Sequence, residues 1–140
     1  MKTLKISILL LVSSLALNVK ASDFECPSSS NELQCVLRHY PAVFRDSPDY
    51  FWKVLNRSRD SALRCGSVRA AADFLSVVRM SNPGADFEEF LSEGIETLCV
   101  RKPACFKQAM KRLDKTSQLH VKMKLDSPLY FEPSKIAVCQ

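Results

Sequence analysis

The sequence predicts a small, mainly α-helical bundle of about five helices, held by disulfides, with a short extended or β-like segment near its C-terminal end. Three observations support this fold class. Apolar residues recur at helical spacing from residue 33 to residue 113, prolines and glycines separate these stretches, and six cysteines occur among 140 residues.

The first 21 residues have the features of a secretory signal peptide. Lys2 and Lys5 precede an apolar run over residues 6–17, and residues 19–21 resemble a signal-peptidase site. The alternative, a membrane anchor, is weaker because this run is about half of the ~20 residues that span a bilayer. We therefore predict cleavage after Ala21, a secreted, extracellular protein without a transmembrane span, and one disulfide-rich helical domain over residues 22–140.

All six cysteines follow the predicted cleavage site, and an even number in a small secreted chain predicts three disulfides. They are Cys26, Cys35, Cys65, Cys99, Cys105 and Cys139. Each bridge would contribute roughly 2–4 kcal/mol by restricting the unfolded chain. The sequon that begins at Asn56 predicts an N-glycosylated position on the surface.

Two helices are expected before residue 66. The first begins at a capping box between Ser29 and Glu32 and ends at Pro41. The second begins at Ser47-Pro48, where serine caps and proline fits the first turn, and ends at Gly66. Their apolar stripes are Leu33, Val36, Leu37 and Tyr40 in the first, and Phe51, Leu55, Ser58, Ala62 and Cys65 in the second.

Three further helices are expected by residue 115. Ser67 caps the third, which residues 82–84 end; a capping box between Asp86 and Glu89 begins the fourth; and Pro103 begins the fifth. Gly94 inside the fourth helix predicts a close packing contact, because glycine otherwise costs about 1 kcal/mol there. On the fifth helix, one face is apolar and the other carries lysines at four-residue spacing, namely Lys107, Lys111 and Lys115.

Residues 119–126 alternate strictly between apolar and polar, which predicts a half-buried strand. Its partner would be residues 129–131 or 135–138, in a short pairing because prolines interrupt the tail. The alternative is that residues 116–125 continue as a helix.

The cysteines can be placed on these elements. Cys35 lies nearly opposite the apolar stripe of its helix, so we expect it to bind an extended end, through Cys26 or Cys139. Cys65 shares an apolar face and should be interior. Cys99 and Cys105 flank a turn and either bond each other or each hold a separate segment. Their spacing fits neither the usual zinc pairs nor a C-x-x-C redox motif, so we predict no metal and no cofactor.

Charge is distributed unevenly after the predicted cleavage site. Residues 22–98 contain 8 basic and 12 acidic residues, a net −4, whereas residues 99–140 contain 9 basic and 3 acidic residues, a net +6. This asymmetry would guide an acidic partner, or the two halves would pair with each other. The candidate basic patch comprises Arg101, Lys102, Lys107, Lys111, Lys115, Lys122 and Lys124; the simpler interpretation of these residues is a solvated helix face.

These features favour a non-enzymatic extracellular interaction or effector protein that binds another protein or an acidic surface, such as an anionic glycan or membrane. Nucleic acid is disfavoured because aromatic residues are not interleaved with the basic ones. A small secreted hydrolase ranks third: His39 and His120 are isolated, and no G-x-S-x-G or H-E-x-x-H motif occurs.

The second alternative is a carrier of a small apolar ligand in a cavity between helices. The residues that would line such a cavity are the large apolar ones, which core packing explains more simply. They are Phe51, Trp52, Phe74, Phe87, Phe90, Phe106, Met110 and Met123.

Overall fold

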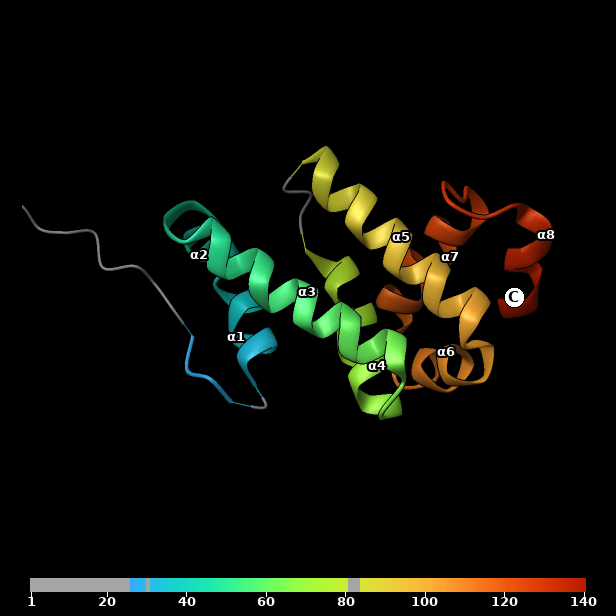
Figure 1. The fold of residues 1–140 in the computed structure, drawn as a ribbon, viewed down its shortest axis with the longest axis horizontal. Coiled ribbons are helices and arrows are strands. Elements are labelled where there is room, and N and C mark those ends of the chain that lie inside the picture. The colour runs from blue at the N-terminus through green and yellow to red at the C-terminus, as the bar shows by residue number, and fades with distance from the viewer. Residues whose placement is uncertain (1–25, 30, 81–83) are drawn as a thin grey trace, which may run out of the picture.

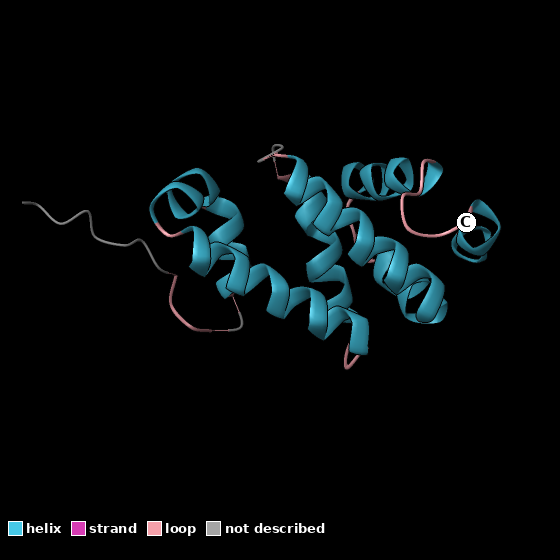
Figure 2. Ribbon diagram, turned by 45° about the horizontal axis from the view of Figure 1, so that its top comes forward, coloured by secondary structure: helices cyan, strands magenta, loops and turns pink. Residues whose placement is uncertain are grey.

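The computed structural model describes residues 26–29, 31–80 and 84–140, and the predicted signal peptide lies outside these ranges. All regular secondary structure in the described residues is helical, which confirms the mainly α class (Figure 2). The elements are α1 (Glu32–Arg38), α2 (Tyr40–Asp46), α3 (Pro48–Arg64), α4 (Val68–Leu75), the 3-10 helix η1 (Ser76–Arg79), α5 (Ala85–Arg101), α6 (Pro103–Met110), α7 (Lys115–Asp126), α8 (Pro133–Ile136) and the 3-10 helix η2 (Ala137–Cys139).

The two longest helices, α3 and α5, pack against each other and organise the molecule (Figure 1). Helices α1 and α2 contact α3, whereas α6, α7 and α8 contact α5. Helix α4 packs against both α3 and α6 and so joins the two groups.

The core contains most of the residues considered for an internal cavity. Phe51, Phe74, Phe87, Phe90 and Phe106 are buried in one cluster. Several rings meet edge to face, as Phe74 and Phe90 do with 6.1 Å between centroids. Of the other members of that set, Trp52 and Met110 are half-buried, and Met123 is exposed.

Gly94 makes the close contact that its position in a helix predicted. A Cβ atom built there would lie 2.5 Å from Cζ of the buried Phe74 ring, closer than carbon atoms can approach. Glycine therefore lets helix α5 approach Phe74 closely.

Several predicted helix starts are confirmed. Helix α3 begins at Pro48, α6 begins at Pro103, and the backbone N–H of Ala70 donates to Oγ of Ser67 at 3.0 Å. Ser47, however, does not cap α3. Its hydroxyl is buried and has no hydrogen-bond partner among the described residues.

The two predicted capping boxes are wrong. Asn31 precedes α1 without a side-chain cap, and the Glu32 carboxylate accepts hydrogen bonds from Tyr50 and Arg57 instead. Helix α5 begins at Ala85, so Asp86 already lies within its first turn. In both places, therefore, the spacing of a capping box is present in the sequence but its hydrogen bonds are not formed among the described residues.

Two predicted helix ends also differ. Helix α1 ends at Arg38, and Pro41 occupies the first turn of the additional helix α2, where its missing N–H costs nothing. At the end of α3, Cys65 rather than Gly66 takes the left-handed conformation, with φ of 50°. The predicted break at residues 82–83 lies outside the described residues.

The predicted strand over residues 119–126 is wrong, and the helical alternative is correct: α7 spans Lys115–Asp126. The carboxylate of Asp114 caps it by accepting 2.9 Å hydrogen bonds from the backbone N–H and the hydroxyl of Ser117. The expected stripe of Lys107, Lys111 and Lys115 is therefore broken, since α6 ends at Met110 and Lys115 belongs to α7. In the tail, α8 and η2 stand where a pairing strand was expected.

Three disulfides connect the six cysteines: Cys26–Cys35, Cys65–Cys105 and Cys99–Cys139. The expected link between Cys35 and an extended end is confirmed, with Cys26 as the partner. Cys99 and Cys105 each hold a separate segment, which was one of the two open alternatives. Cys65 is half-buried rather than interior.

Candidate interaction surface

The structure divides the predicted basic patch among three helices. Arg101 and Lys102 lie at the end of α5, Lys107 and Lys111 on or directly after α6, and Lys115 and Lys122 on α7. These six residues are exposed, and none forms an ion pair with another described residue. Lys124, the seventh, is largely covered and pairs with Glu88.

Ion pairs also join the acidic and basic halves of the chain. Lys124 of the basic half binds Glu88 on α5. In the second pair the polarity is reversed, because Nη1 of Arg79 in the acidic half lies 3.6 Å from Oδ2 of Asp114 in the basic half. The two halves therefore pair with each other in part, but the six exposed basic residues stay available for another molecule.

The outward side of α7 exposes an apolar pair. Val121 and Leu125 are buried, whereas Leu119 is 56% exposed and Met123 is 59% exposed. At about 100° per residue, each pair four positions apart shares one side of the helix, and the two pairs point in opposite directions. The alternating pattern that suggested a strand thus supplies a core-facing pair and a solvent-facing pair.

Charged residues share the outward side of α7 with this apolar pair. By the same helical spacing, Lys115 and Lys122 lie next to Leu119 and Met123, and Asp126 is the acidic residue on this side. All three charged residues are exposed. The outward side of α7 therefore presents two apolar side chains next to three charged side chains whose net charge is positive.

The loop after α7 extends this apolar surface. Leu129 is 66% exposed and Tyr130 is 47% exposed. Met123 and Leu129 line one open hollow of about 390 Å³, together with His120. We call the set Lys115, Leu119, Lys122, Met123 and Leu129 the α7 face.

A buried carboxylate holds this loop in place. Glu96 on α5 has no exposed surface, and it accepts backbone N–H bonds from Leu129 and Tyr130 at 2.8 Å and from Phe131 at 3.0 Å. Three donors satisfy a charge that would otherwise be costly to bury. Leu129 and Tyr130 are thus displayed by an anchored segment.

The Tyr130 hydroxyl is neutral at physiological pH, as an ordinary phenol is, and can donate a hydrogen bond. Desolvation, followed by the negative charges of Glu89, Glu93 and Glu96, raises the pKa of this phenol further above physiological pH.

Sequence reasoning missed Leu119, Leu129, Tyr130 and Glu96 as site residues, and it considered Met123 only as a lining residue of an internal cavity. One signal was present: read as a helix, residues 119–125 place two apolar pairs on opposite sides.

The remaining candidates lie elsewhere. His39 stands at the junction of α1 and α2, and His120 is exposed on α7. Asn56 is half-buried within α3 and donates a 2.9 Å hydrogen bond to the carbonyl of Trp52, so its glycosylation stays a prediction. In the described ranges, no three His, Cys, Asp or Glu side chains are grouped to hold a metal ion.

Comparison with known proteins yields no relative. No protein-family model matches the chain, and no curated protein or solved structure is significantly similar to it. In the part of the chain that the structure describes, no helix has the length and apolar character needed to cross a membrane.

Proposed function

We propose that the protein is a secreted, non-enzymatic interaction protein that binds an acidic extracellular protein through the α7 face. One observation carries the proposal: Leu119 and Met123 project into solvent from a helix that also exposes Lys115 and Lys122. Exposed apolar side chains that gather in one patch with a polar rim are typical of interaction sites.

The composition of the α7 face favours a protein over the other acidic partners. Protein interfaces combine an apolar centre, often with Met, with a polar rim. A sulfated glycan would pair with the lysines but would leave Leu119, Met123 and Leu129 exposed. A membrane would require a broader apolar stripe, because an interfacial helix buries its whole apolar side in the lipid, and α7 interleaves its apolar pair with charges.

Charge complementarity supplies the preference for an acidic partner. Lys115 and Lys122 have no carboxylate partner among the described residues, so a partner's Asp or Glu side chains could approach them directly. Such pairs mainly accelerate association and select partners, and salt weakens them.

The proposal is tested by capturing partners from extracellular fluid on the immobilised, oxidised protein, and by measuring the affinity of each captured protein. We expect the charge reversal Lys115→Glu/Lys122→Glu and the substitution Leu119→Ser/Met123→Ser each to weaken binding at least tenfold. All four residues are exposed, so both variants should fold. Rising salt should weaken binding to the wild-type protein.

Matched controls come from the same half of the chain. Lys107→Glu/Lys111→Glu makes the same charge change outside the α7 face, and Val138→Ser removes another exposed apolar side chain. Both should bind as the wild type does. One result would contradict a protein partner: the wild type binds heparin or anionic vesicles, Lys115→Glu/Lys122→Glu abolishes that binding, and Leu119→Ser/Met123→Ser preserves it.

A further inference from the structure

A cleft of about 740 Å³ lies outside the α7 face, where three parts of the chain meet. Its walls come from the junction of α1 and α2, from α4 with η1, and from the turn between α6 and α7. This volume is in the range of about 300–1,000 Å³ that small-molecule sites occupy.

Three arginines, one from each wall, line the cleft: Arg38, Arg79 and Arg112. Arg79 is paired with Asp114. Arg38 and Arg112 are exposed, and neither has an ion-pair partner among the described residues. Two guanidinium groups at one cleft are therefore available to an outside anion.

The two carboxylates of the cleft do not neutralise these arginines. Asp114 is engaged by Ser117 and Arg79, and those hydrogen bonds and that charge hold the pKa of its carboxyl below the ordinary value. Asp73 lies 3.9 Å from Arg69, which is not part of the cleft lining. The electrostatic balance of the site is thus positive.

The same cleft exposes apolar surface. Leu37, Tyr40 and Leu113 line it, and each is only half-buried against the core. An apolar group placed there would cover surface that water now contacts.

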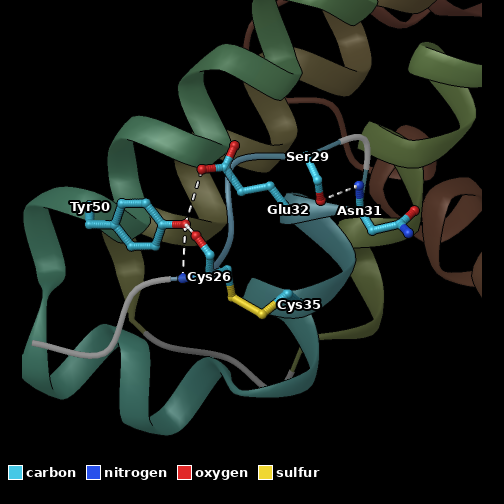
Figure 3. Close-up of a disulfide and its surroundings, with 6 residues drawn as sticks. All are labelled: Cys26, Ser29, Asn31, Glu32, Cys35 and Tyr50. Carbon is cyan, nitrogen blue, oxygen red and sulfur yellow. Dashed lines mark hydrogen bonds between the residues drawn. A yellow bond between two sulfur atoms is a disulfide. The ribbon is translucent and has the colours of Figure 1, made fainter.

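The wall that carries Arg38 is held rigidly. The disulfide Cys26–Cys35 ties α1 to the preceding segment (Figure 3). The hydroxyl of Tyr50 lies 3.0 Å from both the Cys26 carbonyl and a carboxylate oxygen of Glu32.

The wall that carries Arg112 is also braced. The side-chain amide of Gln118 donates 3.0 Å hydrogen bonds to the carbonyls of Met110 and Leu113. Asp114 caps the following helix. A rigid site binds more tightly because less conformational entropy is lost on binding.

We propose that this cleft binds a small anionic amphiphile, with its carboxylate or phosphate head at Arg38 and Arg112 and its apolar body against Leu37, Tyr40 and Leu113. Guanidinium groups recognise both head groups through paired, charge-assisted hydrogen bonds. The site shares no residue with the α7 face and does not depend on the proposed function. It also differs from the cavity among phenylalanines considered from sequence, because it is an open surface cleft.

The test is calorimetric titration of the full, oxidised protein with dodecanoate and with dodecyl phosphate, both below their micelle concentrations. We expect binding at one site per molecule, and the tighter of the two probes identifies the head group. The variant Arg38→Gln/Arg112→Gln should weaken binding at least tenfold. Arg64→Gln/Arg101→Gln, which changes two exposed arginines outside the cleft, should bind as the wild type does.

Four results would overturn the proposal. The first is no measurable binding of either probe. The second and third are binding of dodecyltrimethylammonium, or of inorganic phosphate alone, with the same affinity as the probes. The fourth is an affinity for the probes that Arg38→Gln/Arg112→Gln leaves unchanged. Amide chemical shifts locate the probe independently of the variants. Shifts should appear at residues 34–41, 72–79 and 112–114, and shifts confined to residues 119–130 would place the ligand on the α7 face instead.

Discussion

A single buried side chain, Glu96, stabilises the loop that follows α7. One of its oxygens accepts from Leu129, and the other accepts from both Tyr130 and Phe131. In Glu96→Gln, an NH₂ group that cannot accept replaces one of these oxygens, so at least one buried N–H loses its partner. We expect a loss of about 1–3 kcal/mol in the free energy of unfolding, measured by urea denaturation.

The exposed Glu89 on the same helix provides the matched control. Glu89→Gln should change the free energy of unfolding by less than about 0.5 kcal/mol. Hydrogen exchange should also accelerate at the amides of residues 129–131 in Glu96→Gln alone. Equal stability of the two variants would mean that Glu96 does not hold the loop.

Gly94 and Glu96 differ in how far sequence could reveal them. Glycine in a helix is unfavourable, so the sequence alone indicated a close neighbour for Gly94, although not that Phe74 is that neighbour. No local feature indicated the donors to Glu96, because they lie 33 to 35 residues further along the chain.

At the scale of the element, the cap of α7 should make this helix sensitive to acid. Hydrogen bonds from the Ser117 backbone and then its hydroxyl lower the pKa of Asp114, with a smaller contribution from Arg79. Because the folded pKa lies below the unfolded value of about 3.9, the stabilisation is complete above that value. It is lost as pH falls through the folded pKa.

The variant Asp114→Asn isolates this effect, since asparagine also caps helices but does not titrate. Amide hydrogen exchange in α7, corrected for the intrinsic effect of pH, should show a larger loss of protection between pH 5 and pH 2.5 in the wild type than in the variant. An equal loss of protection in the wild type and in Asp114→Asn would show that Asp114 is not the titrating group.

The helices were predictable where their signals are local. Ser67, Pro48 and Pro103 mark true starts because caps and first-turn prolines act within a few residues. Residues 119–126 were mistaken for a strand because alternation also fits a helix with two apolar sides. Only contact with α5 and η1 shows that Val121 and Leu125 face inward.

At the scale of the whole molecule, the disulfides should differ in their contribution to stability. Cys65–Cys105 joins residues 40 positions apart, and Cys26–Cys35 joins residues 9 apart. In the chain-entropy model the longer loop stabilises more, by about 1.3 kcal/mol. Cys65→Ala/Cys105→Ala should therefore lower the free energy of unfolding further than Cys26→Ala/Cys35→Ala, measured with guanidinium chloride.

The same comparison has an informative opposite outcome. If loss of Cys26–Cys35 costs as much or more, the hydrogen bonds of Tyr50 and Glu32 around that bridge must depend on it. The free energy of unfolding of Tyr50→Phe, alone and combined with Cys26→Ala/Cys35→Ala, would then measure that coupling.

Composition and short-range patterns were sufficient to predict the helical class, several helix starts, the number of disulfides to expect and the uneven distribution of charge. These properties depend on composition or on residues within one or two turns of each other. The tertiary structure alone decided the cysteine pairing, the outward direction of Leu119 and Met123, the partners of Glu96 and the meeting of three arginines at one cleft. Each of these depends on packing between segments far apart in the chain, which local periodicity does not encode.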